Sequence, residues 1–478
     1  MPTHAMPPSA PSLPPPLLAE TLHRVARRYR LPAMEAVPPK PGQEGAAATV
    51  ALTIEQARRT LAAGGVPDEA SQSRFVDALA RMIEDAMRTD AGDPVFQAMV
   101  LRHRFAQVRE YASLSAHADA DRRSVRAAVN KVAHPARPLP SLSEDHRQAL
   151  ARLHASAAAG DWPALADTAR GLMTLGGRAQ SDTLPRQPSL ARLLDSPALE
   201  RLRRLHDLAP DAQVRRYRSL WERQGPRSGS ASAAAHGIAS QQRGAAVEAL
   251  ATQAIASLAQ RLAQAEDMPA AYRAVTSMRV PAAIRGERDR AKSEWDVVLL
   301  RRAGGAGDTP LWDICLLVEA KASADAATTD LPRLLRGLRL LAQADDREVY
   351  AFQTREGVVR LRGASLRTLG AAAAELRERV LYCCDAPADP APRLLGAASR
   401  MQLLSAPPSV AFACRLAQGE PSDRGCLAPL WRELLESPRW HAVLHQYPTL
   451  RQVRDLMVHT DDLTAAIERI PPQAPSSV

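Results

Sequence analysis

Hydrophobic and polar positions follow a helical period through most of the N-terminal half of the chain. Apolar side chains recur every three or four positions, the spacing of an amphipathic helix. This pattern predicts helices over residues 17–35, 52–66, 70–89, 93–116, 144–159, 161–173, 188–207 and 211–224. No strand-like alternation precedes residue 270. We therefore expect an all-helical domain over residues 17–224, after a Pro-rich leader at residues 1–16 that is expected to be disordered.

The pattern changes after residues 225–240, a stretch of small and polar residues that indicates a linker. A long helix is predicted over residues 244–264, followed by strands near 272–281, 294–302 and 311–322. A helix over 330–343, with Pro332 in its first turn, and a strand pair (EVYAFQT and GVVRLR) come next. The order of helix, three strands, helix and two strands predicts an α/β core over residues 241–370. Residues 371–478 are expected to form a mostly helical C-terminal extension.

Three ionisable residues lie on two of these predicted strands. Glu319 and Lys321 point to the same face of their strand, because side chains alternate along it. Asp296 lies on the preceding strand, and the Gly-rich connection AGGAGDTP suits a hairpin that would place it alongside. Ionised groups in otherwise apolar strands are costly unless they have partners or a ligand. A divalent cation held by the two carboxylates, with the lysine beside it, would satisfy all three groups.

The scarcity of lysine in the chain draws attention to Lys321. The chain has 62 Lys and Arg residues, and only four of them are lysines: Lys40, Lys131, Lys292 and Lys321. A lysine retained in so Arg-rich a chain indicates chemistry that a guanidinium cannot supply, such as positioning a water with a titratable point charge. Chance retention is the alternative for any single lysine, and Lys292 is a weaker candidate than Lys321. Mg²⁺ bound by one or two carboxylates would suit phosphodiester hydrolysis.

These residues resemble the PD-(D/E)xK nuclease superfamily, whose restriction-endonuclease-like core has the order α-β-β-β-α-β. The match consists of Asp296 in EWD, Glu319 and Lys321 in EAK, and Glu248 in RGAAVEAL on the preceding helix, within about residues 241–362. The resemblance implies that Asp296 and Glu319 bind Mg²⁺ or Mn²⁺, that Lys321 is catalytic and that Glu248 assists. Trp295 stands where many members have proline. The following helix lacks the QxxxY element of the RecB-like branch.

Further polar residues surround this predicted site. Arg333, Arg336 and Arg339 recur every third residue on the next helix and are candidate phosphate contacts, the alternative being a solvated helix face. Glu294 and Asp313 share the site-facing parity of their strands, although charges at strand ends are usually only solvated.

Composition indicates which kinds of partner and cellular setting are compatible with this chain. The net charge of +10 is compatible with a nucleic-acid partner, but is weak evidence alone. For the expected nuclease, DNA is favoured over RNA as the partner. Five scattered cysteines without a CxxC pair indicate reduced thiols and a cytoplasmic setting. No apolar run is long enough to predict a membrane span, so no membrane partner is expected.

We expect a Mg²⁺-dependent nuclease. The alternative is a non-enzymatic interaction or nucleic-acid-binding protein built on a degenerate nuclease fold. The oligomeric state stays open.

Overall fold

The chain folds into two compact units, each made of segments that are distant in the sequence. The computed structural model describes residues 15–31, 45–134, 143–176, 187–225, 231–304, 310–370, 373–390, 392–421 and 423–471. The first unit combines Met1–Met82, Ser228–Leu403 and Arg424–Val478, and the second combines Ile83–Arg227 and Leu404–Asp423. Residues 1–14 of the predicted leader, which spans residues 1–16, lie outside the described residues. The region 17–224, predicted as one helical domain, contributes to both units.

The second unit is helical throughout its described residues, as the sequence pattern predicts. Its helices are α4 (Pro94–Arg104), α5 (Ala106–Ala133), α6 (Glu144–Ala159), α7 (Trp162–Gly176), α8 (Gln187–Leu194), α9 (Pro197–Leu208), α10 (Ala212–Glu222) and α16 (Pro407–Leu416). Two predicted helices are each divided in two. Pro197 disfavours helical geometry at Ser196, which separates α8 from α9. Phe105 adopts an extended conformation between α4 and α5, and no breaking residue in the sequence marks this division.

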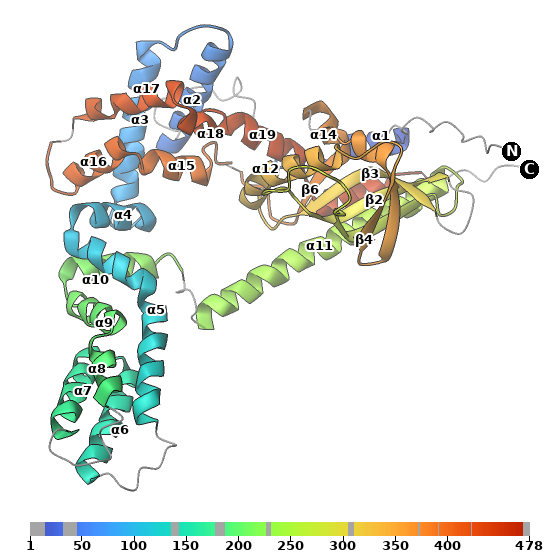
Figure 1. The fold of residues 1–478 in the computed structure, drawn as a ribbon. Coiled ribbons are helices and arrows are strands. Elements are labelled where there is room, and N and C mark those ends of the chain that lie inside the picture. Colours follow the sequence, from blue (N-terminus) through green and yellow to red (C-terminus); the bar gives the residue numbers. More distant parts are fainter. Residues whose placement is uncertain are drawn as a thin grey trace, which may run out of the picture. The chain divides into compact units, whose positions relative to one another are not determined.

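The first unit contains a mixed sheet of seven strands (Figure 1). Its strands are β1 (Tyr272–Arg279), β2 (Glu294–Gly304), β3 (Leu311–Ala320), β4 (Val349–Thr354), β5 (Gly357–Arg362), β6 (Val380–Cys384) and β7 (Met457–His459). The strand order is β2-β1-β4-β5-β3-β6-β7, and β2 also pairs with β3, so the first five strands close into a small barrel. β2 pairs antiparallel with both β1 and β3, whereas β6 pairs in parallel with β3, and β7 in parallel with β6.

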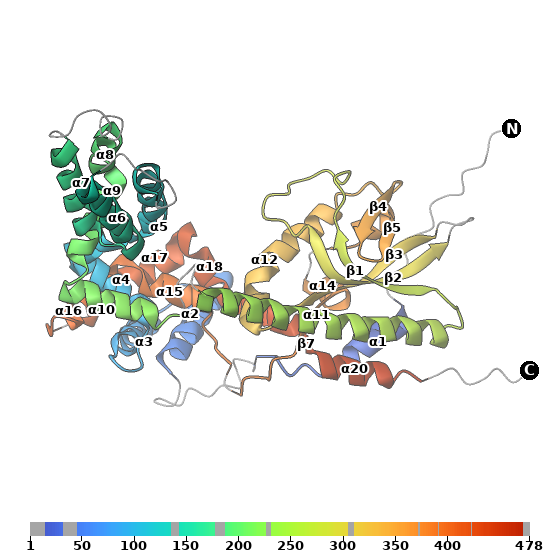
Figure 2. The ribbon, with the colours of Figure 1, turned by 90° about the horizontal axis from the view of Figure 1, so that it is seen from below.

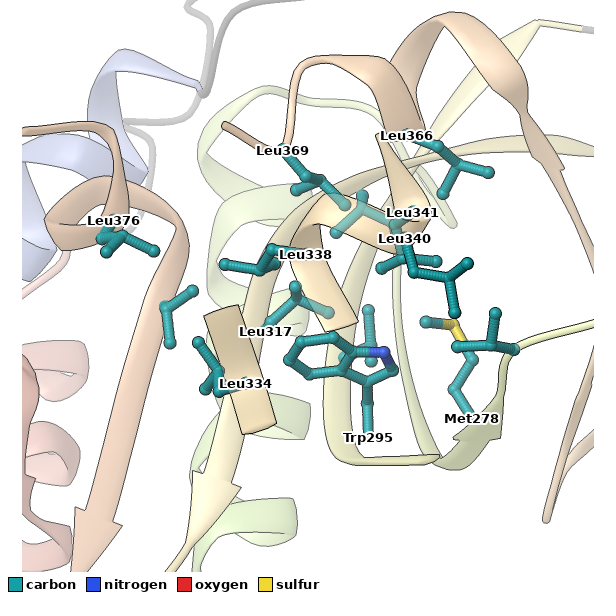
Figure 3. Packing of buried hydrophobic residues seen from close by; sticks show 14 of the residues in the cluster. Met278, Trp295, Leu317, Leu334, Leu338, Leu340, Leu341, Leu366, Leu369 and Leu376 are labelled. Carbon is teal, nitrogen blue, oxygen red and sulfur yellow. The ribbon is translucent and has the colours of Figure 1, made fainter. Parts of the chain in front are cut away.

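Helices cover the sheet of the first unit, which explains its apolar strands. α11 (Ala231–Ala265) runs along one face (Figure 2) and packs on Val297, Leu316 and Val318. α12 (Ala324–Leu341) covers the side that carries Trp295 and Leu317, where Leu334 and Leu338 of α12 meet them (Figure 3). The remaining helices of this unit are α1 (Pro16–Arg24), α2 (Ala46–Ala62), α13 (Gly363–Arg367), α14 (Ala373–Arg379), α15 (Ala397–Leu404), α17 (Ala428–Glu436), α18 (His441–Leu444), α19 (Gln446–Leu456) and α20 (Thr460–Glu468). α3 (Glu69–Met87) begins in this unit, and its residues from Ile83 onward belong to the second unit.

Further predictions about elements differ from the structure. Residues 225–240 are not simply a linker, because α11 begins at Ala231, in an Ala-rich stretch that favours a helix without apolar periodicity. α12 begins at Ala324 and not at residue 330, since Ser323 caps its first turn and Pro332 lies inside the helix. The region 371–478 is mostly helical, as predicted, but it also contributes β6 and β7, which extend the sheet. No described helix has the length and apolar character needed to cross a bilayer.

Candidate active site

The candidate site lies where strands β2 and β3 separate. The last paired residues are Val297 and Val318. One position further, the Asp296 side chain takes the place of a main-chain acceptor, and its Oδ2 accepts the Ala320 N–H at 2.9 Å. On the other edge of β3, the Lys321 N–H donates to the Cys383 carbonyl of β6 at 2.9 Å. The backbone that carries Glu319 and Lys321 is therefore held from both sides.

The structure brings Asp296, Glu319 and Lys321 together. The Lys321 Nζ atom lies 2.9 Å from Glu319 Oε2 and 3.7 Å from Asp296 Oδ2. A third carboxylate comes from α12, since Asp330 Oδ2 lies 3.7 Å from the same Nζ and accepts a 3.3 Å hydrogen bond from the Tyr382 hydroxyl. Burial by itself lowers the pKa of Lys321, but the three carboxylates raise it above its ordinary value. Lys321 is therefore held as an ammonium at the centre of the cluster.

Glu319 is the most buried member of the cluster. It is 0% exposed, and the ammonium groups of Lys292 and Lys321 both donate to its Oε2. Its other oxygen, Oε1, is buried and has no hydrogen-bond partner among the described residues. Burial raises the pKa of Glu319 to about 7, with Asp296 adding to the rise and the two lysines opposing it. A buried acceptor without a partner is costly, so Oε1 is a position where a cation would be stabilising.

Lys292 is a member of the site to which the sequence gave little weight. It is 6% exposed and precedes β2, and its backbone N–H donates to the Arg333 carbonyl of α12 at 3.1 Å. Gly337 permits this close approach, because a Cβ there would lie 2.9 Å from Lys292 Cβ and 3.0 Å from the Lys292 carbonyl oxygen. The scarcity of lysine in the sequence did point to Lys292, as a weaker candidate than Lys321. Asp330 had no signal of its own, because one acidic residue in a helix is ordinary.

The donor set fits a divalent cation held by few protein ligands. The described residues contain no group of three or more His, Cys, Asp or Glu residues arranged to hold a metal ion. Mg²⁺ nevertheless needs only one or two carboxylates, because it keeps several waters and takes substrate oxygens. Asp296 has a side chain 26% exposed and so faces solvent in part, and Glu319 has the unpartnered Oε1. Asp296 and Glu319 are therefore the two residues that could hold such an ion.

The other predicted residues lie at varying distances from this cluster. Glu248 is half-buried on α11, on the face of the sheet opposite α12, and its side chain makes no hydrogen bond or ion pair with a described residue. Arg333 and Arg339 are exposed on α12, whereas Arg336 is half-buried and donates to the Arg290 carbonyl at 3.0 Å. The predicted roles of these four residues stay predictions.

Glu294 and Asp313, which share the site-facing parity in the sequence, do not join the cluster. Glu294 forms a surface ion pair with Arg279 at 3.1 Å. Asp313 is paired with Arg362 near the start of β3, six residues before Glu319 and therefore roughly 20 Å along the strand. An irregularity in the pairing of β2 with β3, between Leu299 and Leu300, breaks the simple alternation.

Comparison with known proteins identifies no relative: no family model, no curated protein and no solved structure matches this chain.

Proposed function

We propose that the chain is a divalent-metal-dependent nuclease that hydrolyses phosphodiester bonds, in DNA rather than RNA, on a restriction-endonuclease-like core. The observation that carries this proposal is the meeting of Asp296, Glu319 and Lys321 at the separating ends of two paired strands. The unpartnered Oε1 of Glu319 supports it, because a buried carboxylate oxygen is a natural cation ligand. The resemblance of Asp296, Glu319 and Lys321 to the PD-(D/E)xK motif supports it as well.

Each residue has a distinct role in this proposal. Asp296 and Glu319 would hold Mg²⁺ or Mn²⁺, which when bound supplies charge stabilisation and lowers the pKa of its water. Lys321 would orient the attacking water and stabilise negative charge on the phosphate, from a position already fixed by three carboxylates. Arg333 and Arg339, exposed on α12, would contact phosphates of the substrate.

The proposal predicts that Glu319→Gln and Lys321→Met each lower the rate of Mg²⁺-dependent cleavage by roughly 100-fold or more, because each removes a group that acts in the reaction. Cleavage of labelled single-stranded DNA, double-stranded DNA and RNA would be measured with Mg²⁺, with Mn²⁺ and with EDTA. Asp296→Asn tests the more exposed carboxylate, and circular dichroism shows whether each variant is folded. Glu294→Gln, which alters a surface ion pair, is the matched control. Equal cleavage by the wild type and all three site variants would contradict the proposal.

One observation favours the non-enzymatic alternative. Lys292 and Lys321 both donate to Glu319, so two ammonium groups already offset the charge of the carboxylate that a metal would need. On a degenerate nuclease fold, such a cluster would serve only to stabilise the core. Nucleic-acid binding without cleavage of any substrate in Mg²⁺ or Mn²⁺ would favour this alternative.

A further inference from the structure

A second polar feature of the first unit lies among α2, α14 and α19. A cavity of about 340 Å³ opens there, and four arginines line it: Arg58, Arg59, Arg377 and Arg451. Two carboxylates, those of Glu55 and Asp455, are the acidic residues of the lining. The lining therefore carries a formal charge of +2. None of these residues belongs to the candidate active site.

The two carboxylates are buried and already paired with arginine. The Glu55 side chain is 2% exposed and accepts from Arg58 Nε at 2.7 Å, Arg58 Nη2 at 2.8 Å and Arg59 Nε at 3.0 Å. Burial alone would raise the pKa of Glu55, but these hydrogen bonds hold it below its ordinary value, so the carboxylate stays ionised. The Asp455 side chain is 12% exposed and pairs with Arg377. The carboxylates thus fix the arginines in place.

The guanidinium groups are the accessible part of the lining. The side chains of Arg58, Arg59 and Arg377 are 21%, 42% and 56% exposed, well above the carboxylates that hold them. Arg451 is exposed and makes no ion pair or side-chain hydrogen bond with any described residue, and the same holds for the half-buried Gln452 beside it. The cavity therefore presents fixed positive charge together with unused N–H donors.

We propose that this cavity binds a phosphate group. Glu55 occupies the fork of Arg58, whereas the fork of Arg451 makes no hydrogen bond with a described residue and matches the oxygens of phosphate in bidentate geometry. A lining of charge +2 balances a phosphate anion. The volume exceeds that of a bare ion and falls within the range of small-molecule sites, so a nucleotide-sized ligand fits. The phosphate would come from a free nucleotide or from the backbone of a nucleic acid. This inference does not depend on the proposed nuclease activity.

The test measures binding to the full chain by isothermal titration calorimetry, in EDTA so that no metal-dependent cleavage occurs. The ligands are adenosine monophosphate, adenosine as its phosphate-free control, and a single-stranded oligonucleotide without a terminal phosphate. Arg451→Gln removes a charged donor that holds no described ion pair, so the fold should persist. It should weaken phosphate binding roughly ten-fold or more. Arg432→Gln, an exposed arginine of α17 outside the cavity, has the same charge change and should bind like the wild type.

Each result decides the proposal. Weaker binding of adenosine monophosphate to the Arg451→Gln variant supports a free-nucleotide site, and weaker binding of the oligonucleotide alone supports a backbone phosphate site. Three results would overturn it: no binding of either phosphate ligand by the wild type, equal binding of adenosine and adenosine monophosphate without any oligonucleotide effect, or the same loss in both variants.

Discussion

At the scale of single residues, the molecule concentrates buried charge around Glu319. Lys292 and Glu319 are 6% and 0% exposed, and removing either from water is costly unless the pair is well made. Lys321 adds a second ammonium to the same oxygen, while Oε1 has no described partner. Apolar residues of similar size would pack there at least as well, so stability alone does not account for this cluster.

Lys292→Met should lower the free energy of unfolding by about 3 kcal/mol in metal-free buffer, because it leaves Glu319 buried with one lysine fewer. The double variant Lys292→Met, Glu319→Met should recover most of that loss, since both buried charges are then absent. Lys131→Met, at an exposed lysine of α5, should change stability by no more than about 0.5 kcal/mol. Urea denaturation of the four proteins measures these differences. A double variant less stable than Lys292→Met alone would contradict a buried charge pair.

The sequence located part of this cluster and missed the rest for a physical reason. Asp296, Glu319 and Lys321 could be brought together from strand alternation and one hairpin, because both rules act over short distances along the chain. Lys292 enters through the packing of α12 against the segment before β2, and Asp330 of α12 enters through its contacts with Lys321 and with Tyr382 of β6. That contact depends on tertiary structure, which alternation within a strand does not encode.

At the scale of elements, the close packing of α12 against the segment before β2 places Lys292 in the site. Gly337 lies inside this helix and is buried, at the point where the helix backbone meets Lys292. Glycine in a helix interior is ordinarily unfavourable by roughly 0.5–1 kcal/mol relative to alanine. Its presence here is explained by the close approach, since a methyl group would contact Lys292 backbone atoms that cannot easily move.

Gly337→Ala should therefore destabilise the first unit, despite the better helix propensity of alanine, because its Cβ would lie 3.0 Å from the Lys292 carbonyl oxygen. Gly244→Ala is the matched control, because Gly244 lies inside α11 and a Cβ there would meet nothing within 4 Å. The control should gain roughly 0.5–1 kcal/mol. Thermal denaturation shows whether each variant is more or less stable than the wild type. A stability gain for Gly337→Ala would show that α12 does not need this contact.

Elements with regular apolar periodicity were predictable, and elements without it were not. β1, β2 and β3 were confirmed near their predicted bounds. β2 and β3 were recognisable by the continuous apolar runs VVLL and ICLLV. The first turns of α12 are rich in Ala, Asp and Thr, and their start depends on the Ser323 cap. β6 is a five-residue strand of fully buried residues, VLYCC, and β7 has three residues. Short apolar runs of this kind do not distinguish a strand from a buried helical turn.

At the scale of the whole molecule, each unit has its own hydrophobic core. Ile83–Arg227 and Leu404–Asp423 form the second unit, which has a hydrophobic cluster that includes Leu153 of α6 and Leu165 of α7. The first unit takes its segments from both ends of the chain, so that α1 packs with α11 and α20 around Leu258. A contiguous helical domain over residues 17–224 was the natural prediction, because composition gives no sign that early helices pack with late ones.

Separate cores predict separate responses to core substitutions. Leu153 and Leu258 are both 0% exposed, so replacing either with alanine should cost about 2–5 kcal/mol through lost burial and an incompletely filled cavity. Leu153→Ala should increase hydrogen exchange in the second unit and leave the β1–β3 segments protected, and Leu258→Ala should do the reverse. Hydrogen exchange followed by mass spectrometry resolves the two regions. If both variants lose protection equally across all segments, the chain unfolds as one cooperative body and the two cores are not independent.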